Sequence, residues 1–244
     1  MPDSARAGDR DNDDPLGSHV LVGVTASYAV LVFASLYVLG TPPAAAESGP
    51  QVVAWFRENR DAVRWAVWML TVSIPPLAVM IALLRRLLPS PHRDVFLVGG
   101  VTFLVMGGVF TWTLAALALH PDTLEPAIAR TVLDVAVFFG PVLTGATTTM
   151  MAPVTLLALR RRADLPVWLG LLGLAAFVEQ SIETITIFGS TGFTQPGGAM
   201  NLQLGAGLTL AWLVCFGLWG GLRGRDQSLV DPAHFVLQEA PTRD

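Results

Sequence analysis

Two glutamates interrupt an otherwise apolar stretch in the run Phe177-Val178-Glu179-Gln180-Ser181-Ile182-Glu183-Thr184. Glu179 and Glu183 are four residues apart, so in a helix they lie on one face. A carboxyl group inside a membrane-spanning helix is costly and usually faces a partner or a water-filled cavity. Two nearby carboxylates in a low dielectric cannot both stay ionised without a counter-charge. The spacing therefore predicts a proton or cation site, or a pocket for a basic or polyhydroxyl solute.

Further polar groups are expected near this face. Arg130 and Asp134 are four residues apart in the preceding span and should pair. At 1.5 Å per residue, Glu179 lies roughly 20 Å into its span, and Glu183 lies roughly 6 Å further along. The preceding span runs the other way, which brings Asp134 to the same depth with Arg130 above it. We therefore predict a ligand or ion site formed by Glu179, Glu183, Asp134, Arg130 and Thr184.

A purely structural role explains the same residues. Glu183 could pair with Arg130 or extend to the outer interface, while a protonated Glu179 donates to a neighbouring threonine. Glu183 alone fits this explanation, whereas Glu179 lies too deep to reach the interface and favours a cavity. The sequence leaves both interpretations open.

The elements that must position these residues are membrane helices, as the composition shows. The chain has 244 residues, of which 52% are hydrophobic and only 14% charged, with a mean hydropathy of +0.56. An ordinary soluble domain has about 25% charged residues, so lipid is the solvent for most of this chain. The chain lacks a basic patch large enough for nucleic acid, and its single Cys215 excludes an internal disulfide.

Hydrophobic runs predict an all-α, polytopic membrane protein with a six-helix transmembrane domain over residues 19–222. An acidic N-terminal tail, 1–18, is expected to be disordered, and residues 223–244 form a polar C-terminal tail. Each run is long enough to cross about 30 Å of hydrocarbon. The expected spans are about 20–40, 65–84, 95–119, 131–159, 166–187 and 202–222.

Arginine placement predicts the orientation. With a cytoplasmic N-terminus, eleven arginines lie inside and four outside, the arrangement that the positive-inside rule prefers. Both termini are then cytoplasmic. All 15 basic residues are arginine, which indicates a GC-rich bacterial genome and hence the bacterial inner membrane. The inner set is Arg6, Arg10, Arg85, Arg86, Arg93, Arg160, Arg161, Arg162, Arg223, Arg225 and Arg243; the outer set is Arg57, Arg60, Arg64 and Arg130.

Three local patterns add detail. Ala44-Ala45-Ala46 after the first span resembles a signal-peptidase site, but the long acidic leader and long apolar run favour an uncleaved helix. Ser48 with Gln51 predicts a helix start before an amphipathic interfacial segment. Pro75-Pro76 predicts a kink in the second span, or a backbone element that lines a polar cavity.

Glycines mark expected helix contacts. Gly99-Gly100 and Gly107-Gly108 lie about two turns apart on one face of the third span, which predicts a packing seam. Small residues spaced by four in the sixth span, including Gly217 and Gly221, are a weaker signal of the same kind.

Enzyme chemistry is less well supported. The run Phe188-Gly189-Ser190-Thr191-Gly192 is not the Gly-x-Ser-x-Gly elbow of a serine hydrolase. The four histidines lie at span ends, in loops or in tails, where they cannot hold a haem between spans or complete a zinc site. A metal held by His120, Glu183 and Asp134 is a weak alternative. The sequence favours a protein that is not an enzyme, with no cofactor and no metal.

Two functions remain. The first is a helical bundle with an outward-facing acidic cavity between spans two, four and five, which binds or moves a proton, a cation or a small polar solute. The second is a non-catalytic accessory or scaffold subunit of a larger membrane complex, with the glycine faces as partner contacts. The expected partners are the lipid bilayer and a membrane-protein partner or a second copy of the chain.

Overall fold

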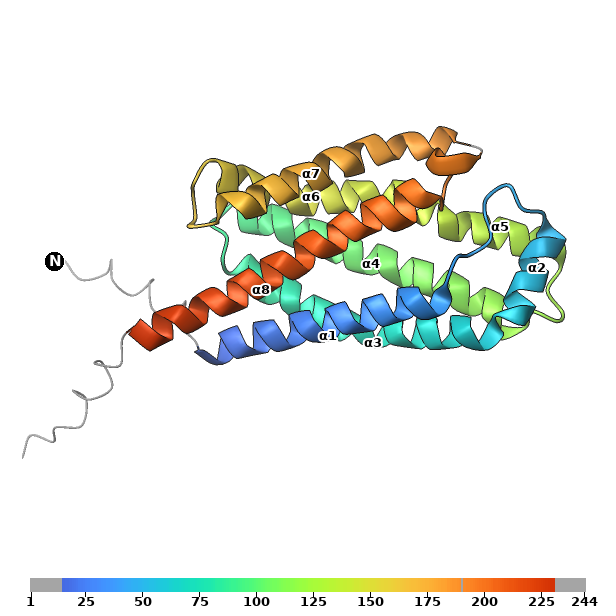
Figure 1. Cartoon of the computed structure of the whole chain (residues 1–244), viewed down its shortest axis with the longest axis horizontal. Helices are drawn as coiled ribbons and strands as arrows, with labels where there is room; N and C mark the ends of the chain where they lie inside the picture. The colour runs from blue at the N-terminus through green and yellow to red at the C-terminus, as the bar shows by residue number, and fades with distance from the viewer. Residues whose placement is uncertain (1–14, 190, 231–244) are drawn as a thin grey trace, which may run out of the picture.

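The computed structural model describes residues 15–189 and 191–230, and all regular elements within them are helical (Figure 1). This confirms the all-helical prediction. In chain order they are α1 (Pro15–Leu39), α2 (Gly49–Glu58), α3 (Arg60–Arg85), α4 (His92–Leu119), α5 (Pro126–Val137), α6 (Phe139–Leu159), α7 (Val167–Glu183), the 3-10 helices η1 (Thr184–Phe188) and η2 (Gly192–Thr194), the π-helix η3 (Met200–Gly205) and α8 (Ala206–Val230).

The long helices run side by side, and many of their apolar side chains point outward. Five segments are long and apolar enough to cross a membrane, and Leu143–Leu159 is a shorter apolar helix. Tyr37 and Trp112 are 88% and 71% exposed, which a soluble protein of this size would rarely tolerate across a whole bundle. These helices indicate a multi-pass membrane protein in contact with lipid. The five are Gly17–Leu39, Arg60–Arg85, His92–Leu119, Val167–Phe188 and Met200–Arg223.

The predicted tails lie mostly outside the described residues. Residues 15–18 form the first turn of α1, and α8 extends to Val230, so the predictions for 1–14 and 231–244 fall beyond what the structure describes. The start of α1 and the end of α8 lie at the same end of the bundle (Figure 1).

The fourth predicted span is two helices. Instead of one helix over 131–159, α5 ends at Val137 and α6 begins at Phe139. Pro141 has no backbone N–H, so it cannot donate to the carbonyl of Val137, where a continuous helix would require that bond. The interruption falls at that point. By contrast, α3 remains one helix through Pro75 and Pro76.

The opposite end of the bundle is closed by α2 and α5, which pack on each other. The predicted start of α2 is confirmed, because the Gln51 side chain accepts a hydrogen bond from the Ser48 backbone N–H at 2.7 Å. Val52, Val53 and Phe56 form its buried face. This short amphipathic helix lies across the ends of the long helices (Figure 1).

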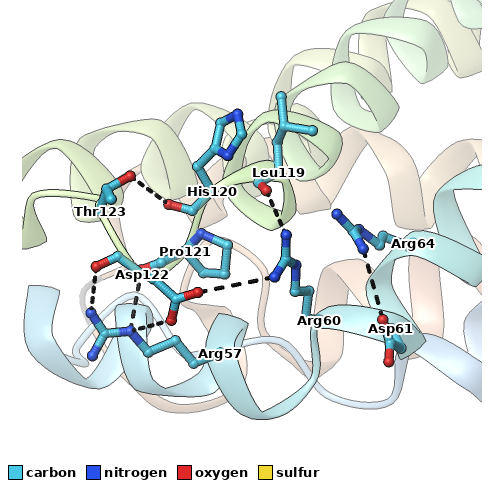
Figure 2. A network of polar contacts seen from close by, with 9 residues as sticks. All are labelled: Arg57, Arg60, Asp61, Arg64, Leu119, His120, Pro121, Asp122 and Thr123. Carbon is cyan, nitrogen blue, oxygen red and sulfur yellow. Dashed lines mark hydrogen bonds and ion pairs between the residues drawn. The ribbon is translucent and has the colours of Figure 1, made fainter.

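Two arginines, Arg57 of α2 and Arg60 of α3, join the α2–α3 connection to the α4–α5 loop (Figure 2). Arg57 donates to the carbonyls of Pro121 and Asp122 at 3.2 and 3.0 Å, and Arg60 donates to that of Leu119 at 3.0 Å. The Asp122 carboxylate lies 3.5 Å from Arg57 and 4.0 Å from Arg60. Exposed ion pairs contribute about 0–1 kcal/mol each, so the hydrogen bonds to carbonyls position the loop at least as much as charge does.

Several glycines allow helices to approach closely, but only part of the predicted seam does so. A Cβ built on Gly99 would lie 2.8 Å from the Met150 Cα of α6, and one on Gly100 would lie 2.7 Å from Ile81 of α3. Gly217 of α8 packs directly on Thr25 of α1. Gly107, in contrast, faces open space. The first glycine pair is therefore a packing seam, while Gly107 borders a cavity.

Candidate functional site

The acidic residues lie on the buried face of α7. The side chains on this face recur every three or four residues, as expected for a helix packed on one side, where α7 meets α6 and α8. Glu183 is 2% exposed and Glu179 is 9% exposed. The prediction that both acids share one face is confirmed by their common burial. The face consists of Leu169, Gly170, Gly173, Ala176, Glu179, Gln180 and Glu183.

Gln180 connects the two carboxylates. Its Nε2 donates to Glu179 Oε2 at 2.9 Å and to Glu183 Oε2 at 2.7 Å. Its Oε1 accepts from the Thr147 hydroxyl of α6 at 2.5 Å. The Thr147 hydroxyl also lies 3.0 Å from the Thr144 carbonyl of its own helix, and Thr148 and Thr149 donate to carbonyls of that helix at 2.6 and 2.7 Å. Of these three threonines, Thr147 belongs to the acidic network.

The second amide comes from η3. Asn201 Nδ2 donates to Glu183 Oε1 and, at 3.4 Å, to Thr186 Oγ1. The backbone N–H of Gly197 donates to Asn201 Oδ1 at 3.0 Å and fixes the amide's orientation. Gly205, at the end of η3, packs directly on the Glu183 carboxylate, where a Cβ would overlap with Oε2. The π-helix thus brings both an amide and bare backbone to the acid, a local distortion that is frequent at functional sites.

Glu183 and Gln180 form part of the wall of a cavity of about 800 Å³. The segment after α1, residues 40–44, and the segment 192–199 before η3 line one end of the cavity, which we take as its mouth. It reaches inward to Tyr28, eleven residues from the end of α1 and thus about 16 Å along the helix. Most of the wall is apolar and draws on α1, α3, α4, α5 and α8 as well as α7. The cavity is therefore bounded by more helices than spans two, four and five alone.

The predicted Arg130–Asp134 pair is confirmed, with Nη2 and Oδ1 2.6 Å apart. Arg130 Nη1 also donates to the carbonyls of Ala44 and Glu47, at 3.0 and 3.3 Å. The two carbonyl contacts hold the connection between α1 and α2, whose Ala44 borders the cavity mouth. No hydrogen bond or ion pair described for Arg130 or Asp134 joins either residue to Glu179 or Glu183.

Thr184 lies away from the network. It is exposed, and its hydroxyl donates to the Ser181 carbonyl at 2.8 Å. The buried threonine is Thr186, two residues further on. The change from α-helix to 3-10 helix after Glu183 explains this, because residues three apart in a 3-10 helix eclipse each other.

Two polar atoms near the network lack partners among the described residues. Glu179 Oε1 and Thr209 Oγ1 are buried and make no hydrogen bond there, although most buried polar atoms in proteins do. Thr209 borders the cavity. His120 caps the exposed end of α4, and among the described residues the structure has no group of three metal-ligating side chains.

No family model matches the chain, and neither the curated proteins nor the solved structures contain a match to it. The functional argument therefore depends on the geometry of the cavity.

Proposed function

We propose that this protein is a membrane bundle whose acidic cavity binds, and moves across the bilayer, a proton, a cation or a small polar solute. The supporting observation is the position of Glu183, which is buried by helix packing yet forms part of the wall of an 800 Å³ cavity. Glu179, linked to it through Gln180, would be the second protonatable group, one turn deeper.

We infer six crossings, with α5 and α6 together forming the fourth. The common location of the α1 start and the α8 end supports an even number of crossings (Figure 1). Arg57, Arg60 and Arg130 lie at the end that carries the cavity mouth. The larger set of arginines, which includes Arg85, Arg160 and Arg223, belongs to the opposite end, where the chain termini lie. The positive-inside rule then makes the cavity end the outer one and the termini cytoplasmic, and we assign the protein to a bacterial inner membrane.

Proton flux into proteoliposomes loaded with a pH-sensitive dye tests the proposal. Under an imposed pH gradient, we expect wild-type flux well above that of empty liposomes, and loss of that excess in Glu183→Gln and Glu179→Gln. Glu58→Gln is the matched control, because Glu58 is exposed on α2. Equal flux from wild type and both buried-acid variants would refute the role of the acids.

The alternative, an accessory subunit of a larger complex, gains no support from the glycines that suggested it. Gly99, Gly100 and Gly217 already pack on helices of this chain. A stoichiometric partner recovered in mild detergent would favour this alternative, and a lone monomer or homo-oligomer would favour the acidic cavity.

A further inference from the structure

The amide hydrogens of the acidic network are already used in hydrogen bonds. Gln180 Nε2 directs its two hydrogens at Glu179 and Glu183, and Asn201 Nδ2 directs its two at Glu183 and Thr186. A primary amide has only two donor hydrogens, so neither amide has one left for a ligand. What remains available on this part of the wall is acceptor capacity, because a carboxylate has about four lone-pair sites and Glu183 uses one per oxygen.

The charge that the cavity wall can carry is negative and comes from Glu183. Glu183 is the only carboxylic acid among the described residues that border the cavity, and that set contains no arginine, lysine or histidine. Arg130, which contacts Ala44 at the cavity, directs Nη2 at Asp134 and Nη1 at backbone carbonyls. A ligand that neutralises Glu183 must therefore bring its own positive charge and its own hydrogen-bond donors.

The remainder of the wall selects for an apolar body. Away from the acidic network, the cavity is bordered mainly by aliphatic and aromatic side chains such as Val32, Leu77, Phe103 and Leu133. Its volume of about 800 Å³ falls within the range of small-molecule sites, about 300–1,000 Å³. A bare metal cation needs about six converging oxygen ligands, whereas amide nitrogens occupy the space beside Glu183.

We propose that the ligand of this cavity is an amphiphilic organic amine, with a protonated primary or secondary ammonium head on Glu183 and an alkyl or aryl body in the apolar part. This inference rests on the proposed function and specifies its substrate class. The ammonium would donate to the free lone pairs of Glu183. The tail would follow the apolar wall inward toward Tyr28.

Four probes with an eight-carbon chain separate the effects of charge, hydrogen-bond donor and apolar tail: octylammonium, octyltrimethylammonium, octanol and octanoate. Full-length protein in lipid nanodiscs is titrated with each, and the thermal unfolding midpoint is followed. We expect saturable stabilisation by octylammonium. We expect at least tenfold weaker binding of octyltrimethylammonium, which has charge but no N–H donor, and of octanol, and none of octanoate.

Two variants locate the site. Glu183→Gln should weaken octylammonium binding at least tenfold, whereas Glu58→Gln should leave it unchanged. Gly107→Leu adds a side chain where the structure has open space at the cavity border, so it should weaken binding with the acidic network intact. Equal affinity for octanol or octanoate, or wild-type affinity in both Glu183→Gln and Gly107→Leu, would overturn the inference.

The proton-flux assay separates this inference from the proposed function. Flux that depends on Glu183 without saturable octylammonium binding would overturn the ligand class and leave the acidic transport site standing. Selective octylammonium binding, together with proton flux that is the same in wild type and Glu183→Gln, would support the ligand class and reject proton movement through the cavity.

Discussion

At the residue scale, Glu183 depends on two amides and one glycine. Asn201 and Gln180 each donate to one of its oxygens, and Gly205 leaves room for the carboxylate against the backbone. A buried carboxylate without such donors would carry the full cost of desolvation. The site therefore requires that α7 and η3 pack so that Asn201 and Gly205 both lie against Glu183.

Gly205→Ala should disrupt this site. The added Cβ would overlap with Glu183 Oε2 and lie 2.8 Å from Gln180 Nε2, so one or both side chains must move. Overpacking of this kind costs about 1–3 kcal/mol, and we expect a lower thermal unfolding midpoint together with loss of Glu183-dependent proton flux. Gly207→Ala is the control: two residues on, its Cβ meets nothing within 4 Å. A Gly205→Ala protein with wild-type flux would show that the close approach is unnecessary.

Sequence reasoning could identify the two acids but not most of their partners. The i,i+4 spacing predicts the shared face of Glu179 and Glu183, and likewise the Arg130–Asp134 pair. Asn201 is 18 residues from Glu183 and reaches it only because the intervening segment folds back and η3 widens the helix. A π-helix depends on tertiary packing, so no spacing rule predicts it. Gln180 lay between the two acids and was the one available signal.

At the element scale, α4 has two glycine pairs with different surroundings. Gly99 and Gly100 allow α6 and α3 to approach closely, whereas Gly107 faces open space at the cavity border. Spacing alone predicts a common role for both pairs, since it shows which face they share but not what lies opposite. The same limit applies to α5 and α6, whose break at Phe138, three residues before Pro141, interrupts an otherwise continuous apolar run.

These glycines offer a matched pair of substitutions on one helix. Gly99→Ala should destabilise the bundle by about 1–3 kcal/mol, because its Cβ would lie 2.8 Å from the Met150 Cα and the backbone cannot yield easily. Gly107→Ala should be neutral or stabilise by up to about 1 kcal/mol through helix propensity. Thermal unfolding of both variants in the same detergent measures the difference. A reversed order would contradict the assigned seam between α4 and α6.

At the scale of the whole molecule, the charged residues at the two ends and the position of the cavity indicate one orientation of the bundle in the membrane. The segments 40–44 and 192–199 border the mouth at the end closed by α2 and α5, while Arg223 and Asp164 pair at the other end, 2.9 Å apart. Composition and hydropathy predicted the membrane bundle because they sum over many residues. The cavity could not be predicted, since it depends on which side chains fail to fill the space between the packed helices.

Cysteine labelling tests the direction and the number of crossings together. In a Cys215→Ser background, Thr123→Cys and Ser90→Cys place exposed thiols just beyond the two ends of α4, which is about 42 Å long. A membrane-impermeant maleimide should label Thr123→Cys in intact bacterial spheroplasts, and Ser90→Cys only after permeabilisation. Arg162→Cys, beyond α6, should behave like Ser90→Cys, because α5 and α6 together cross the bilayer. Labelling of Arg162→Cys alongside Thr123→Cys would show that this pair does not cross, and the reverse pattern at Ser90 and Thr123 would place the cavity mouth in the cytoplasm.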